Sequence, residues 1–184
     1  MQRLFYGGTN MYLGVDLGST NIKAAIYDGS MQLVGQQSRP VEYLRENGFV
    51  EFDAERYYNE LAALIAQLTR DCGVSKIAFT GQAESLVCAD AEGRACMHAI
   101  SWMDERSTEE CKLLAAQFDA ALCERVTGQQ ALLPTWPATK ILWLKKNRPD
   151  VFAAAETFML LKDYIVFRLT GRKLADMSIA TFTF

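Results

Sequence analysis

Residues 12–28, YLGVDLGSTNIKAAIYD, decide the fold of this chain. Apolar residues alternate with small or polar residues over residues 13–17 and again over residues 22–26. Alternation with a period of two is typical of extended strands. The residues between the two runs, 18–21, tolerate turn conformations and carry hydroxyl and backbone N–H donors. The stretch therefore predicts a strand, a tight turn and a second strand.

A carboxylate, Asp16, stands at the end of the first predicted strand, just before the polar turn. A carboxylate beside a turn of this kind can hold a hydrated metal ion and wrap backbone donors round a phosphate. An ordinary hairpin with a polar tip would show the same spacing of residues. Short glycine motifs also occur by chance, so the spacing does not identify a phosphate site. On spacing alone the two interpretations are equally good.

The composition excludes several classes of protein. The chain has 184 residues, half of them hydrophobic, which is enough for one good-sized core and part of another. Its net charge is −3 with scattered Lys and Arg, which predicts neither a nucleic-acid partner nor an anionic membrane surface. The longest apolar window, residues 151–161, is too short to cross a bilayer. Five widely spaced cysteines without a CxxC pair predict reduced thiols in a cytoplasmic protein.

Strand and helix patterns alternate after the opening stretch. We predict a third strand over residues 32–41, a polar connection over residues 42–52, and a helix from Ala54 to about Asp71 with Asp53 as its N-cap. A strand over residues 76–80 follows this helix. Because a crossover helix separates it from the first strand, the two should pair in parallel.

The second half of the chain is predicted to be mostly helical. Short strands are expected over residues 85–89 and 99–102. The later expectations are a helix running towards Val126, a helix from Pro137 to near Asn147, a helix over residues 159–169, and an extended segment from Leu174.

Two sets of polar residues are candidates for binding a hydroxylated substrate. Gln82 and Glu84 follow the predicted parallel strand, and the carboxyl ends of such strands are where open α/β sheets bind ligands. A solvated loop explains them equally well. Asp104 and Arg106 could present hydrogen bonds to sugar hydroxyls. Alternatively, Asp104 or Ser107 only caps the helix that follows.

Six segments, taken in this order, resemble the FGGY family of carbohydrate kinases, which includes glycerol, xylulose and ribulose kinases. They are GVDLGSTNIKAAIYD, GFVEFDAERYYNEL, IAFTGQAESLVCAD, SWMDERS, PATKILWLKKNRPDVF and LLKDYIVFRLTGRKLADMSIAT. The resemblance implies an α/β fold, the N-terminal domain of the actin-like ATPase (ribonuclease H-like) fold. Residues 1–10 would be a lead-in and residues 11–184 most of that domain, with its end and the C-terminal domain absent.

The resemblance also implies ATP-dependent phosphorylation of a sugar or polyol hydroxyl, with Mg²⁺ bridging the phosphates. It places Asp16 as the carboxylate that orients the metal. The residues that would face the ATP phosphates are Gly18, Ser19, Thr20, Asn21 and Lys23. The residues that would contact the sugar are Gln82, Ala83 and Glu84, with Asp104 and Arg106 as a second candidate set. The catalytic base is expected beyond Phe184, so this fragment should be inactive by itself.

Three positions depart from the family pattern and leave the substrate open. Relatives commonly carry Met-His or Arg-Glu after the glutamine, where this chain has Ala83-Glu84. Thr135 stands where glycerol kinases have an aromatic residue, and Ile179 replaces an asparagine. The departures at Ala83 and Ile179 keep an alternative open, a non-catalytic sugar-binding or regulatory actin-like module.

Two further expectations concern partners and other classes of ATPase. The motif DLGST would also suit an actin-like activator of a radical dehydratase, but the cysteine spacing here does not suit an iron–sulfur cluster. A fragment with an uncovered sheet edge and apolar patch could form a homodimer.

Overall fold

The computed structural model describes residues 10–183, and these form two compact units. The first unit runs up to Val41 and also contains Arg56–Gly81. The second contains Glu42–Glu55 and the chain from Gln82 onward. The predicted lead-in, apart from Asn10, lies outside the described residues.

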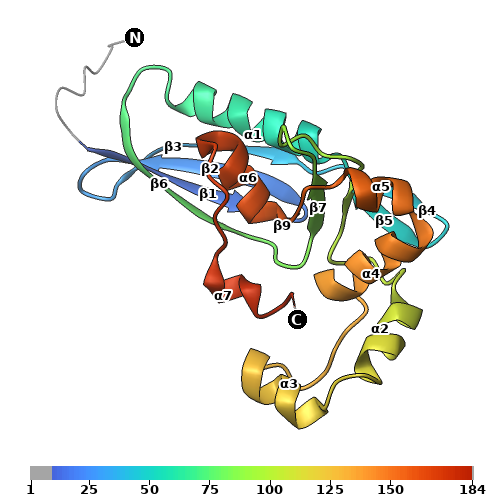
Figure 1. Ribbon diagram of the computed structural model, residues 1–184. Coiled ribbons are helices and arrows are strands. Elements are labelled where there is room, and N and C mark those ends of the chain that lie inside the picture. The colour runs from blue at the N-terminus through green and yellow to red at the C-terminus, as the bar shows by residue number, and fades with distance from the viewer. Residues whose placement is uncertain (1–9, 184) are drawn as a thin grey trace. The chain divides into compact units, whose positions relative to one another are not determined.

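The first unit is built on a four-stranded sheet with the order β3-β2-β1-β6. Its strands are β1 (Met11–Leu17), β2 (Asn21–Tyr27), β3 (Leu33–Pro40) and β6 (Val74–Gly81). β2 pairs antiparallel with both β1 and β3, whereas β6 pairs parallel with β1 (Figure 1). The prediction of three antiparallel strands followed by a parallel strand is confirmed.

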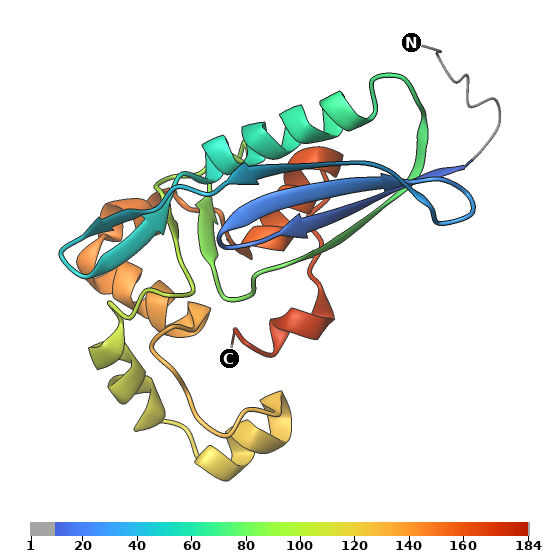
Figure 2. The ribbon, with the colours of Figure 1, turned by 180° about the vertical axis from the view of Figure 1, so that it is seen from behind.

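Helix α1 (Ala54–Leu68) lies along one face of this sheet (Figure 2). Tyr57, Leu61 and Leu64, which share one face of the helix at helical spacing, are buried. The helix starts at Ala54 as predicted but ends at Leu68, before the expected end near Asp71. The sheet contributes alternate residues to the same core, as period-two alternation requires: Met11, Leu13, Val15, Leu17, Ile22, Ala24 and Ile26.

The second unit contains a five-stranded antiparallel sheet with the order β4-β5-β8-β7-β9. Its strands are β4 (Leu44–Glu46), β5 (Phe49–Phe52), β7 (Leu86–Ala89), β8 (Ala99–Ile100) and β9 (Thr157–Leu160). The prediction of a polar connection over residues 42–52 is wrong, because that segment forms the β4–β5 hairpin. Asn47 and Gly48 make its turn, both with positive φ (52° and 83°), and Asn-Gly is a strong hairpin signal.

The helices of the second unit include one predicted correctly and one that divides in two. Helix α4 (Pro137–Asn147) has the expected bounds, with Pro137 in its first turn, where a missing N–H costs nothing. The single helix expected to reach Val126 is instead α2 (Thr108–Ala115) and α3 (Ala120–Thr127). Asp119 separates them, because its side chain accepts the N–H of Leu122 and so starts a new helix.

The last part of the chain departs from the expected pattern at two places. The helix predicted over residues 159–169 is α6 (Leu161–Thr170), and the residues before it form β9, which pairs with β7. The extended segment expected from Leu174 contains a short helix, α7 (Met177–Ala180), where Asp176 accepts the N–H of Ser178. Helix α5 (Pro149–Ala154) lies between α4 and β9 in the chain.

The core of the second unit joins its sheet to α4 and α5. A buried cluster comprises Leu86, Cys88, Ile100, Leu144 and Val151. All five cysteines are free thiols in this structure. No helix in the described part of the chain has both the length and the apolar composition needed to cross a membrane.

Candidate active site

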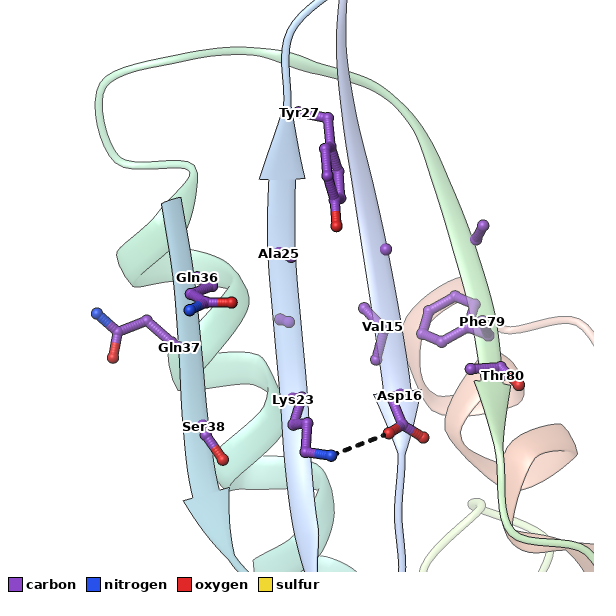
Figure 3. A pocket seen from close by; sticks show the side chains of 13 residues that line it. Val15, Asp16, Lys23, Ala25, Tyr27, Gln36, Gln37, Ser38, Phe79 and Thr80 are labelled. Atoms are coloured by element: carbon purple, nitrogen blue, oxygen red, sulfur yellow. Dashed lines mark ion pairs between the residues drawn. The ribbon is translucent and has the colours of Figure 1, made fainter. Parts of the chain in front are cut away.

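The first candidate feature, at the end of β1, is an acidic and a basic side chain on neighbouring strands. Asp16 in β1 pairs with Lys23 in β2 in the sheet register, and the Asp16 Oδ2 atom lies 3.6 Å from the Lys23 Nζ atom. Because Val15 and Leu17 point into the core, Asp16 points to the opposite face of the sheet. Figure 3 shows the two side chains directed toward each other there.

A shallow hollow of about 720 Å³ surrounds this ion pair on the open face of the sheet. Its polar lining residues include Tyr27, Gln36, Ser38 and Thr80 (Figure 3). Both charged side chains remain accessible, with 40% of Asp16 and 60% of Lys23 exposed. An exposed ion pair of this kind adds little to stability, so both groups are available to a ligand.

The turn between β1 and β2 is held in place by α1 and requires a glycine. The Tyr57 hydroxyl donates to the Gly18 carbonyl over 3.1 Å, and the Val41 N–H donates to the Thr20 carbonyl over 2.9 Å. A β-carbon on Gly18 would lie only 2.5 Å from the Asn21 carbonyl oxygen. The turn is therefore fixed from both sides, which suits a loop that must present donors in one geometry.

The residues of this turn fit a magnesium ion that is shared with phosphates. Mg²⁺ keeps several waters and is usually held by one or two carboxylates together with phosphate oxygens. Asp16 offers one accessible carboxylate of this type. Within residues 10–183 no group of three or more His, Cys, Asp or Glu side chains is placed to enclose a metal ion. The donor set therefore suits a shared ion and does not suit a closed protein cage.

Strand β6 ends beside this turn and leads directly to the second candidate feature. Gly81 pairs with Leu17, and a β-carbon on Gly81 would lie 2.5 Å from the Leu17 Cβ atom. Only glycine allows β6 to approach β1 this closely. The next residue, Gln82, begins the second unit.

The substrate turn, defined as Gln82, Ala83 and Glu84, is the second candidate feature. The Ser85 hydroxyl donates to the Gln82 Oε1 atom over 2.7 Å and accepts the Trp102 N–H over 3.0 Å. Glu84 has a φ of 64°, in the left-handed region that residues with a β-carbon rarely adopt. The structure thus fixes the Gln82 side chain and holds Glu84 in an uncommon backbone conformation.

Glu84 has two polar neighbours, Thr135 in the loop before α4 and Lys140 in α4. Partial burial raises the pKa of Glu84, while a hydrogen bond with the Thr135 side chain and the nearby Lys140 charge act in the opposite direction. The Lys140 Nζ atom donates to the Glu84 carbonyl over 3.3 Å and to the Ser101 carbonyl over 2.8 Å. Lys140 is fully buried, and this burial lowers its pKa to about 7 against the pull of the Asp104 and Glu84 carboxylates.

Asp104 and Arg106 form a buried clamp inside the second unit. Asp104 is fully buried and accepts the Val50 N–H over 2.6 Å. The Arg106 guanidinium donates to both Asp104 oxygens over 2.8 Å, lies 2.8 Å from Glu51, and stacks 4.0 Å from the centre of the Phe49 ring. Burial by itself would raise the pKa of Asp104, but the bonds from Arg106 and Val50 outweigh it and hold that pKa below its usual value.

The capping role considered for Asp104 or Ser107 is not what the structure shows. Ser107 occupies the N-cap position of α2, yet its side chain makes no capping bond there. Its hydroxyl donates instead to the Pro134 carbonyl over 2.7 Å and lies 2.9 Å from the Thr139 hydroxyl. The Asp104 carboxylate instead accepts the Val50 N–H and the Arg106 guanidinium. Sugar contact by Asp104 and Arg106 stays a prediction.

Comparison with known proteins identifies the family. Residues 11–184 match the family described as FGGY family of carbohydrate kinases, N-terminal domain. The chain belongs to this family.

The relatives of this FGGY chain are carbohydrate kinases much longer than itself. It is 29% identical to the xylulose kinase of Escherichia coli strain K12 over 94% of this chain and 36% of the relative. It is 31% identical to the glycerol kinase of Janthinobacterium sp. strain Marseille, over 93% of this chain and 36% of the relative. The crystal structure of xylulose kinase from Rhodospirillum rubrum superposes with a TM-score of 0.88 at 26% identity, covering 95% of this chain and 37% of that one.

These comparisons confirm the predicted fold class, the actin-like ATPase fold, for this FGGY domain. The chain spans about a third of the length of these relatives. Sequence reasoning singled out the β1–β2 turn and the substrate turn but missed Lys140. One signal was present, since Lys140 stands four residues before the buried Leu144 and therefore shares the buried face of α4.

Proposed function

We propose that this chain is the N-terminal part of an enzyme that phosphorylates a hydroxyl of a sugar or polyol with ATP. The observation that carries the proposal is the accessible Asp16–Lys23 pair beside the fixed turn at Gly18, in a chain of the FGGY family. We further propose that the catalytic base, most adenine contacts and a C-terminal domain lie in sequence after Phe184.

In this proposal the β1–β2 turn serves the nucleotide. Asp16 holds and orients the metal, and Lys23 places a positive charge against the transferred phosphate. The backbone and side-chain donors of Ser19, Thr20 and Asn21 face the phosphate oxygens. A Mg²⁺ ion held there would neutralise part of the phosphate charge.

The substrate turn serves the sugar or polyol. Gln82 and Glu84 offer hydrogen bonds to hydroxyl groups. Trp102, whose side chain is partly exposed, is joined to the same turn by its backbone N–H, which donates to the Ser85 hydroxyl. An aromatic ring beside polar groups suits a sugar, whose ring has apolar faces and polar edges. We also propose a cytoplasmic setting, which the five free thiols suit.

Nucleotide binding tests the first half of the proposal. Titration of the full-length protein that carries this chain with a fluorescent ATP analogue, with and without Mg²⁺, should show tighter binding with the metal. Asp16→Ala should abolish this metal-dependent gain, because it removes the carboxylate that would share the ion. Asp71→Ala, at an exposed position, is the matched control and should behave as wild type. Equal metal dependence in Asp16→Ala and wild type would refute the role of Asp16.

Turnover tests the second half. The full-length protein that carries this chain should produce ADP with at least one member of a panel of pentuloses, hexuloses and polyols. The 184-residue chain by itself should produce none, because the base lies outside it. Steady ADP production by the isolated chain would contradict the assignment. Sugar binding without ATP consumption by the full-length protein would favour the non-catalytic module instead.

A further inference from the structure

The first turn of α4 and the loop before it hold the Glu84 residue at two points. The Thr135 side chain, in the loop, lies within hydrogen-bonding reach of the Glu84 carboxyl group. Lys140, in the helix, donates to the Glu84 backbone carbonyl over 3.3 Å. The same Lys140 Nζ atom donates to the Ser101 carbonyl over 2.8 Å, so one ammonium group joins the substrate turn to the segment before Trp102.

The backbone of Glu84 needs such support. Its φ of 64° lies in the left-handed region, where a residue with a β-carbon is destabilised. Conformations of this kind persist only where the surrounding structure over-determines them, and they concentrate at functional sites. The hydrogen bond from Lys140 acts on the carbonyl of this same residue, so it stabilises the strained conformation directly.

A buried lysine is an uncommon way to fill the space beneath a turn. Lys140 is fully buried, whereas the neighbouring Lys145 on the same helix is exposed. Removing an ammonium group from water is costly, and an apolar side chain of similar length would fill the same volume without that cost. The first turn of α4 is also fastened by Thr139, whose hydroxyl lies 2.9 Å from the Ser107 hydroxyl.

We propose that Lys140 is a positioning residue for the sugar or polyol substrate. It fixes the backbone of Glu84 and thereby sets the direction in which the Glu84 carboxyl group meets a substrate hydroxyl. Lys140 is not itself in contact with the substrate, because its side chain is fully buried. The inference rests on the proposed function, in which the substrate turn binds the sugar.

Steady-state kinetics of the full-length protein test this role, with Lys140→Met, Lys140→Gln and the control Lys145→Met. Lys140→Met keeps the length and loses the donor, so the KM for the sugar should rise about tenfold, as for one lost hydrogen bond to a charged group. The KM for ATP should stay within about twofold of wild type, because the nucleotide residues belong to the other unit. Lys140→Gln keeps an N–H donor and should show a smaller rise.

Three results separate the outcomes. If wild type phosphorylates a sugar and Lys140→Met has the same KM values as Lys145→Met, the positioning role is refuted and the proposed function stands. Equal rises in both KM values of Lys140→Met would also refute it, since a general structural defect would act on both substrates. If wild type phosphorylates and binds no sugar or polyol, the proposed function fails and the inference falls with it.

A measurement on the unmodified protein covers the case in which the variants do not fold. The titration of the Lys140 Nζ atom can be followed by NMR of protein labelled at lysine side chains. Adding the sugar should shift this titration, because the Glu84 carboxylate that acts on Lys140 becomes engaged with the ligand. An unchanged titration at saturating sugar would refute the coupling between Lys140 and the substrate turn.

Discussion

Replacing Asp104 with alanine should destabilise the second unit far more than replacing an exposed carboxylate does. The change removes the acceptor of the Val50 N–H and of the Arg106 guanidinium, and both Asp104 and the Arg106 side chain are almost completely buried, at 0% and 1% exposed. Breaking a buried ion pair by removing one partner costs about 3–5 kcal/mol. Since Glu51 still lies 2.8 Å from Arg106 Nη2, we expect a loss of about 3 kcal/mol, the lower end of that range.

Urea unfolding followed by tryptophan fluorescence measures this effect, because all three tryptophans lie in the second unit. The matched control is Glu92→Ala, which removes a carboxylate 66% exposed and paired with Arg94. An exposed pair contributes less than about 1 kcal/mol, so the control should lose no more than that. The double variant Asp104→Ala/Arg106→Met should recover part of the loss, because it also removes the unpaired buried charge.

The same carboxylate makes a pH prediction whose sign follows from its lowered pKa. The Asp104 pKa is held below its usual value in the folded chain. The ionised group therefore stabilises the fold above the unfolded pKa of about 3.9 and loses this effect as the pH falls through the folded value. The difference between wild type and Asp104→Ala should accordingly shrink below about pH 4. If Asp104→Ala costs no more than Glu92→Ala at neutral pH, the buried clamp is refuted and a substrate role for Asp104 gains support.

Two further predictions concern Lys140 and Gly81. The Lys140 pKa of about 7 in the folded chain lies below its unfolded value of about 10.4, so the unfolded chain binds more protons between these values. The free energy of unfolding of wild type should therefore rise with pH from about 7 to about 10 relative to that of Lys140→Met. If the two proteins show the same dependence of this free energy on pH, Lys140 is not buried. Gly81→Ala should cost about 1–3 kcal/mol by denaturant unfolding, because its β-carbon would meet Leu17 at 2.5 Å. Gly73→Ala, where nothing lies within 4 Å of the added carbon, is the control, and equal stability of the two variants would contradict the close approach of β6 to β1.

Local patterns carried enough information to predict the first unit. Apolar and polar residues alternate over residues 12–28 because one face of the sheet is buried. The same period of two appears in the exposure of the side chains along β1 and β2. The crossover helix between β3 and β6 made the parallel pairing predictable, because a helix must intervene between parallel neighbours. Gly18 and Asp16 were found for the same reason, since a turn and its flanking residues lie within one short stretch.

The second unit was predicted less well because its strands are short and their partners lie far apart in the chain. Leu44–Glu46 is exposed at every position, so it shows no alternation, and only the Asn47-Gly48 turn marked the hairpin. Thr157–Leu160 merges with the helix after it and becomes a strand through its pairing with β7. A pairing partner some seventy positions away leaves no local signal, which is why the helix predicted over residues 159–169 includes the last two residues of β9.

The sequence by itself determined the family, the order of strands in the first sheet, and the turn with Asp16 and Lys23. Those features depend on neighbours in the chain. Only the tertiary structure decided that Asp104 and Arg106 are buried against Val50 and Glu51, and that Lys140 bonds the Glu84 carbonyl. The physical reason is that a charged side chain looks the same in sequence whether water or a distant carbonyl satisfies it, and folding alone brings that carbonyl within reach.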